Sequence, residues 1–258
     1  MTQHRYPMLT LICTTAILVV PAAAFGKAAC ELKQMVTGEE FESLQKQWNV
    51  DHALPKSRDS YGHKDPDDKI YFYDTTSQSF KKDAILRWRK SDGKFTIKNR
   101  SDAGDMPDAQ CQVDFVSETS SKKSCQYDTH SEGHGPKELK LSKEQKDFLH
   151  TKNLQWDASQ LVQMGPIHSY QTSVAADVCS GLGNKSPIDF ESWIMENTGR
   201  SEMVYEVSVK VKDPDKCADR NQAFRSCLGK AGVDVKNNRG TKTEAVYKFF
   251  QPEKSGPD

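Results

Sequence analysis

The sequence lacks the marks of several large functional classes. It carries no excess of either charge, since 36 Lys and Arg residues balance 36 Asp and Glu residues, which argues against a general electrostatic nucleic-acid binder. No Cys-x-x-Cys pair indicates a zinc site, and no Gly-x-Ser-x-Gly motif indicates a serine hydrolase. Any anion site must therefore gather its cations locally.

Long apolar runs are equally scarce, and only one stands out, at residues 8–20. It follows Arg5, precedes the small residues 21–24, and is short for a bilayer span. These features predict a signal peptide over residues 1–24, with an uncleaved anchor as the alternative. We expect a secreted protein, extracellular or periplasmic, without membrane association after cleavage. One domain is expected over residues 25–251 and a disordered tail over 252–258.

Cysteine usage agrees with an oxidising compartment. Cys13 would leave with the signal peptide, and the remaining six cysteines allow up to three disulfides. Fifteen pairings are possible. Short spacing favours Cys111–Cys125 and Cys217–Cys227 as local bridges.

The pattern of apolar residues predicts many strands with a few helices between them. Helices are expected over 37–48, 142–152 and 215–231, the first two with capping boxes. Strands are expected over 70–75, 84–90, 94–100, 111–118, 167–179, 188–197, 202–212 and 242–250. An Asp-Gly turn joins the second and third strands, and 52–68 and 125–135 are expected to be polar loops. The order favours an α+β fold with a mostly antiparallel sheet, open or closed.

Side-chain alternation gathers the cations of the expected strands on one face. Arg87 and Arg89 share a face of their strand, and Lys98 and Arg100 share a face of the next. Such a face is most simply the solvated side of an open sheet. The alternative is a closed barrel with a charged interior, where guanidinium and ammonium groups would grip phosphate oxygens.

Four short runs carry a resemblance to a known family. Residues 71–75 (YFYDT), 84–89 (AILRWR), 93–98 (GKFTIK) and 204–210 (VYEVSVK) resemble the CYTH, or triphosphate tunnel, family. The resemblance implies a mostly antiparallel β-barrel with flanking helices, binding a small-molecule triphosphate or polyphosphate. It also implies Mg²⁺ or Mn²⁺ as cofactor and, in some members, hydrolysis of the bound triphosphate.

The resemblance also implies roles for individual residues. Lys33 would be catalytic, and Glu31, Glu206 and Glu196 would hold the metal, with Glu191 as an alternative to Glu196. The residues expected to contact the phosphates are Arg87, Arg89, Lys98, Arg100, Lys210 and Lys242.

Two positions depart from the family pattern. Ala29 stands where the Glu-x-Glu-x-Lys signature has its first Glu, and Ser208 stands where a second acidic ligand is common. The sequence therefore supports two hypotheses: a secreted metal-dependent triphosphatase, and a non-catalytic secreted scaffold that keeps the tunnel to bind anions or only as structure.

Overall fold

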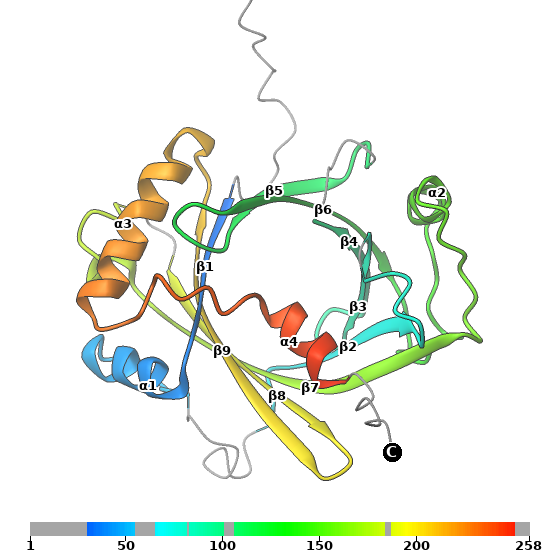
Figure 1. Ribbon diagram of the computed structural model, residues 1–258, viewed down its shortest axis with the longest axis horizontal. Helices are drawn as coiled ribbons and strands as arrows, with labels where there is room; N and C mark the ends of the chain where they lie inside the picture. The colour runs from blue at the N-terminus through cyan, green and yellow to red at the C-terminus, as the bar shows by residue number, and fades with distance from the viewer. Residues whose placement is uncertain (1–29, 55–64, 82, 101–105, 184–186, 251–258) are drawn as a thin grey trace, which may run out of the picture.

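The computed structural model describes residues 30–54, 65–81, 83–100, 106–183 and 187–250. Their nine strands close into a barrel in the order β1-β5-β6-β4-β3-β2-β7-β8-β9 (Figure 1). Only β1 and β5 run parallel; every other neighbouring pair is antiparallel. The expected α+β class and the closed form of the sheet are confirmed. The expected signal peptide and C-terminal tail lie outside the described residues.

The elements have the following bounds. The strands are β1 (Cys30–Val36), β2 (Asp68–Thr75), β3 (Ile85–Arg89), β4 (Lys94–Asn99), β5 (Gln110–Phe115), β6 (Ser121–His130), β7 (Leu161–Val174), β8 (Ile188–Asn197) and β9 (Arg200–Val211). The helices are α1 (Gly38–Gln47), α2 (Lys143–Thr151), α3 (Cys217–Lys230) and α4 (Lys242–Phe249).

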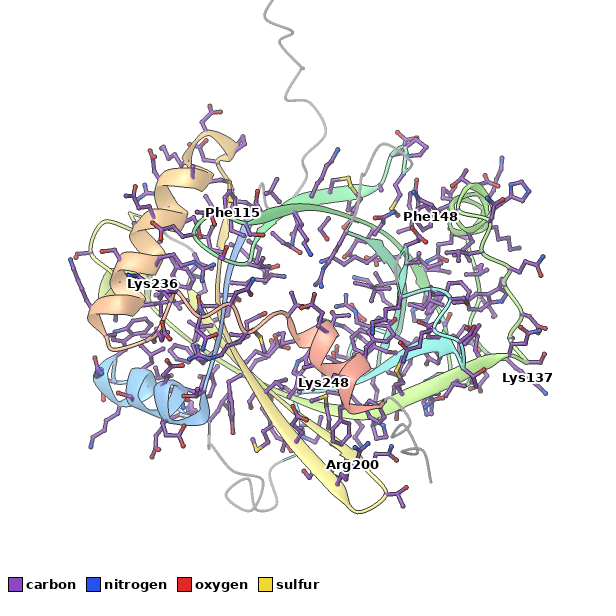
Figure 2. All side chains as sticks on the ribbon, in the orientation of Figure 1. Phe115, Lys137, Phe148, Arg200, Lys236 and Lys248 are labelled. Carbon is purple, nitrogen blue, oxygen red and sulfur yellow. A yellow bond between two sulfur atoms is a disulfide. The ribbon has the colours of Figure 1, made fainter. Side chains whose placement is uncertain are left out.

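Helices cover the outside of the barrel on two sides. Helices α1 and α3 lie against the wall that contains β8 and β9, where Phe41 and Phe224 join a buried apolar cluster. Helix α2 covers the opposite wall, and Phe148 packs among the outward side chains of β3, β4 and β6 (Figure 2). Each such buried side chain contributes about 1.5–3 kcal/mol to folding. The outer face under these helices is apolar, and the charged residues of strands such as β3 and β4 turn inward.

Local signals fix several of these elements as the sequence predicts. Thr37 and Ser142 form the expected capping boxes of α1 and α2. Gly93 turns the β3–β4 hairpin with φ +62°, and a Cβ there would meet the ring of His130 at 2.6 Å. The positive φ therefore favours glycine at this turn.

Helix α4 corrects the expected strand over 242–250. Thr241 caps it and Glu244 completes a capping box, a helix-start signal that outweighs the short alternating pattern. The helix lies across one opening of the barrel (Figure 1). Val246, Tyr247 and Phe249 are buried against apolar residues of the inner wall, which closes that part of the interior.

The expected polar loop over 125–135 is also wrong at its N-terminal end, since β6 runs through His130. Its outward residues Cys125 and Tyr127 are buried, whereas Gln126 and Asp128 alternate with them. A strand whose inner face lines a polar cavity lacks the apolar content that marks a strand in sequence.

Three disulfides cross-link the described residues: Cys30–Cys217, Cys111–Cys125 and Cys179–Cys227. The second confirms a prediction, and the predicted Cys217–Cys227 bridge is wrong. Both cysteines belong to α3, where ten residues span roughly 15 Å, and bridged Cα atoms must lie within about 7 Å.

No helix among the described residues is long and apolar enough to cross a membrane.

Candidate functional site

A cavity of about 260 Å³ lies inside the barrel, beside the apolar part that α4 fills. Three acidic residues line it, Glu31, Glu191 and Glu206, together with an excess of basic ones. The seven basic residues of the lining are Lys33, Arg87, Arg89, Lys98, Arg100, Lys210 and Lys242. The expected phosphate contacts thus line one cavity inside the closed barrel, and the alternative of an open sheet with a solvated face does not hold.

Strand pairing brings these cations together. Residues Arg87 and Arg89 alternate with buried Leu86 and Trp88 on β3. In the adjacent strand β4, Lys98 pairs with Ile85 and is itself only 9% exposed. Apolar residues on the outer face hold the strands in register, and the inward positions carry the charges.

Asp114 on β5 organises the first of two charge clusters. Its carboxylate lies 3.6 Å from Lys33 Nζ, 3.4 Å from Lys98 Nζ and 3.8 Å from Arg100 Nε. Lys33 also pairs with Glu31 at 2.8 Å. Burial opposes ionisation of Asp114, but the three cations outweigh it and lower its pKa. Glu31 is likewise held ionised: Lys33 overcomes the effect of burial and lowers the pKa of Glu31 to about 2.

Lys242 organises the second cluster. Its ammonium group contacts Glu191 and lies 3.0 Å from Glu206 Oε1. The same nitrogen lies 4.6 Å from the ring centroid of Trp193. Glu191 also accepts hydrogen bonds from Ser169 Oγ at 2.9 Å and Trp193 Nε1 at 2.6 Å. Burial opposes the charge of Glu191, yet Lys242 and its other partners lower the pKa of this carboxyl group.

Three guanidinium groups in the cavity keep unused donors. Within the described part of the chain, the Nε atoms of Arg87, Arg89 and Arg100 are buried without a hydrogen-bond partner. Burial, reinforced by Arg89, lowers the pKa of Arg87 to about 9. Burial and then Lys33 lower the pKa of Lys98 to about 7. The surroundings thus disfavour the charged forms of Arg87 and Lys98, and buried donors without a hydrogen-bond partner are costly.

Two predicted site residues stand apart from this group. Glu196 lies near the β8–β9 turn and lines a different cavity with Asn197 and Arg200, so it is not brought to the tunnel. Lys210 belongs to the cavity lining, but its side chain is 57% exposed and forms an ion pair with Asp189 at 3.6 Å.

Sequence reasoning missed Asp114 and gave Glu191 only as an alternative. The signal for Asp114 was available, because Gln112 and Asp114 alternate within the expected strand 111–118. Both line up on the inner face, where Gln112 Nε2 donates to Asp114 Oδ1 at 2.7 Å and Glu31 Oε2 at 2.9 Å.

The carboxylates do not fit the metal set that the family resemblance implies. In the register of β1 and β9, Glu31 lies opposite Lys210 and Glu206 lies opposite Met35. Four residues, roughly 13 Å of strand, therefore separate the two glutamates. Lys33 lies between them. Each carboxylate already holds an ammonium group, and the described residues contain no group of three or more His, Cys, Asp or Glu side chains placed to hold a metal ion.

Comparison with known proteins supports the fold. No protein-family model matches the sequence, and no curated protein matches it. Among solved structures, a "putative adenylate cyclase" from Bacillus halodurans matches with a TM-score of 0.51 and 15% identity, over 85% of this chain and 96% of that one. Another "putative adenylate cyclase", from Vibrio parahaemolyticus, has a TM-score of 0.38 and 9% identity, over 86% and 99%. At such identity, the first match bears on the fold alone.

Proposed function

We propose that the tunnel binds a compact polyanion, either an inorganic triphosphate or polyphosphate or the triphosphate of a larger molecule. The observation that carries this proposal is the set of buried guanidinium Nε atoms without hydrogen-bond partners. Seven basic and three acidic residues line the cavity, and Asp114 adds a fourth carboxylate, so the basic residues remain in excess. Phosphate oxygens match the planar donor pattern of arginine and accept from lysine as a point charge.

Electrostatics favour binding in this space. Burial lowers the pKa values of Arg87 and Lys98, and repulsion from neighbouring cations, first Arg89 and Lys33 respectively, lowers them further. An anion among these groups would supply the missing countercharge in an enclosed, poorly solvated site, where charge pairing is stronger than in water. The ligand would also complete the hydrogen bonds of the three Nε atoms.

Cavity size favours a phosphate chain over a complete organic ligand. Pockets for drug-sized molecules occupy roughly 300–1,000 Å³, and the tunnel occupies about 260 Å³. A second cavity of about 430 Å³ shares Lys98, Arg100 and Thr241 with it, and could take the remainder of a longer ligand. The fold that this chain shares with the "putative adenylate cyclase" of Bacillus halodurans suits a ligand of this kind.

We propose that the tunnel binds its anion and does not hydrolyse it. The acidic residues are engaged by lysines, and the sequence keeps more of the expected phosphate-gripping cations than of the expected metal-holding carboxylates. This favours the anion-binding scaffold over the metal-dependent triphosphatase. The three disulfides support a site of action in an oxidising compartment, as expected for a secreted protein.

Calorimetric titration with tripolyphosphate tests the proposal, with pyrophosphate and ATP as comparison ligands. Arg87→Gln should weaken binding of tripolyphosphate roughly 10- to 150-fold, since a hydrogen bond to a charged group contributes about 1.5–3 kcal/mol. Lys94→Gln is the matched control: Lys94 stands on the same face of β4 as Lys98, but its side chain is 49% exposed and pairs with Asp92.

Failure of the wild-type protein to bind any of the three anions would overturn the proposal. So would an equal loss of affinity in the Arg87→Gln and Lys94→Gln variants. Phosphate release from tripolyphosphate, followed colorimetrically with and without Mg²⁺, decides between the binding scaffold and the triphosphatase.

A further inference from the structure

Two glutamates of the tunnel lie directly opposite each other on neighbouring strands. Glu191 of β8 and Glu206 of β9 are paired in register, and both line the cavity. Like charges at directly opposed positions are destabilising. A buried pair of carboxylates therefore requires a cation between them, and a divalent metal would be one solution.

Here the chain supplies its own cation. Lys242 Nζ contacts Glu191 and lies 3.0 Å from Glu206 Oε1, with the three side chains only 6–13% exposed. The ring of Trp193 lies 4.6 Å from the same nitrogen and adds a cation–π contact. Two carboxylates and an aromatic face thus enclose one ammonium group.

Helix α4 fixes the position of this ammonium group. Lys242 is the first residue of the helix, directly after the cap Thr241. Val246 and Phe249, one and two turns further on, are buried against the inner wall of the barrel. The lysine is therefore anchored by the packing of the helix that closes the barrel.

We propose that Lys242 is the built-in counter-cation of the Glu191–Glu206 pair, and that it takes the place of a divalent metal. The anion then binds to a tunnel that is complete without metal. The second part of this inference rests on the proposed function; the first part, the exchange of lysine for metal, does not.

Mn²⁺ alone is the probe for the first part. Loss of the electron paramagnetic resonance signal of free Mn²⁺ measures binding to the full chain, and circular dichroism confirms that each variant is folded. Lys242→Gln should bind Mn²⁺ at least tenfold more tightly than wild type, because the carboxylate pair loses its own cation. Glu206→Gln added to Lys242→Gln should remove this gain.

Lys210→Gln is the matched control. It also removes one lysine from the tunnel lining, but that lysine forms its ion pair with Asp189 and leaves the Glu191–Glu206 pair with Lys242, so no gain is expected. If Lys242→Gln binds Mn²⁺ no better than wild type, or if Lys210→Gln gains as much, the inference is overturned. Lys242→Met, which keeps the length and apolar stem of the side chain, replaces Lys242→Gln if the latter does not fold.

The second part is tested on the wild-type protein. Its affinity for tripolyphosphate, measured in EDTA and again in Mn²⁺ at matched concentrations of free anion, should differ by less than threefold. A tenfold or greater requirement for metal would overturn the inference while leaving anion binding intact. If tripolyphosphate does not bind under either condition, the proposed function is wrong. The Mn²⁺ titration still tests the role of Lys242, because it does not depend on anion binding.

Discussion

Proton uptake by Lys98 should accompany anion binding. Burial, followed by the charge of Lys33, lowers the pKa of Lys98 from 10.5 to about 7; Arg100 and Arg87 act in the same direction, and Asp114 opposes them. At pH 8 only about a tenth of the Lys98 side chains would then carry a proton. A phosphate nearby stabilises the protonated form, so binding should take up close to one proton.

The size and sign of the effect follow from this pKa. Between about pH 7 and pH 9, the affinity for tripolyphosphate should fall up to tenfold for each pH unit, and it should be insensitive to Lys98 below pH 6. Lys98→Arg should remove most of the effect near pH 8, since the ordinary pKa of arginine lies about two units above that of lysine. The two proteins bind the same ligand, so protonation of the ligand itself cancels in the comparison.

Titration calorimetry in buffers of different ionisation enthalpy measures the protons taken up. At pH 8 the wild-type protein should take up approximately 0.9 proton more than the Lys98→Arg variant on binding tripolyphosphate. At pH 6 the two proteins should take up the same number of protons. Equal uptake by the two proteins at pH 8 would refute the reasoning.

The same pKa has a consequence for the ligand-free fold. Because the folded pKa lies below the unfolded one, the unfolded chain binds more protons between pH 7 and 10.5. The destabilisation due to charged Lys98 is therefore complete below pH 7 and fades as pH rises. Relative to a Lys98→Met variant, the free energy of unfolding should rise with pH over this window.

Two further predictions concern stability. Arg225→Met should lower the free energy of unfolding by about 2–5 kcal/mol, because Arg225 is buried and donates to the backbone oxygens of Lys33 and Phe115; a loss below 1 kcal/mol in urea denaturation would contradict this. Replacing both Cys30 and Cys217 by Ser should cost about 2–5 kcal/mol, since their bridge closes a loop of 187 residues; an unchanged urea midpoint would show that the bridge does not stabilise the fold.

Much of the barrel could be predicted from the sequence because its outer face is apolar. Where inward charge alternates with outward apolar residues, as at Arg87 and Trp88, the pattern identifies both the strand and the face that lines the tunnel. Alternation alone could not predict closure of the sheet, since it is equally typical of an open sheet with one solvated face; the expectation of a barrel came from the family resemblance.

The errors have local physical causes. Lys242 was expected on a strand, and its role as a phosphate contact remains a prediction. The capping signal of Thr241 and Glu244 was present in the sequence, but the apolar residues that follow support either period over so short a segment. Cys217 and Cys227 are near in sequence, but both lie in α3, and the rise of the helix between them holds them too far apart to form a bridge. Sequence spacing alone therefore gave the wrong disulfide.

Contacts between residues far apart in the chain could not be predicted from a single sequence. Nothing local to Asp114 indicates that it would meet Lys33 of β1, because that contact depends on the parallel pairing of β1 with β5. The same holds for Glu191, whose partner Lys242 is brought in by α4.

The place of β1 in the barrel has a consequence for the order of assembly. Both its neighbours, β5 and β9, follow it in the chain, and the cysteine at its start is joined to one after the last strand. During synthesis, β1 cannot pair with β9 until most of the polypeptide has emerged, so one of its two edges lacks its native partner until then. Contacts between such distant segments slow the search for the native topology, so the ring should be completed late, with that edge of β1 exposed to wrong partners until then.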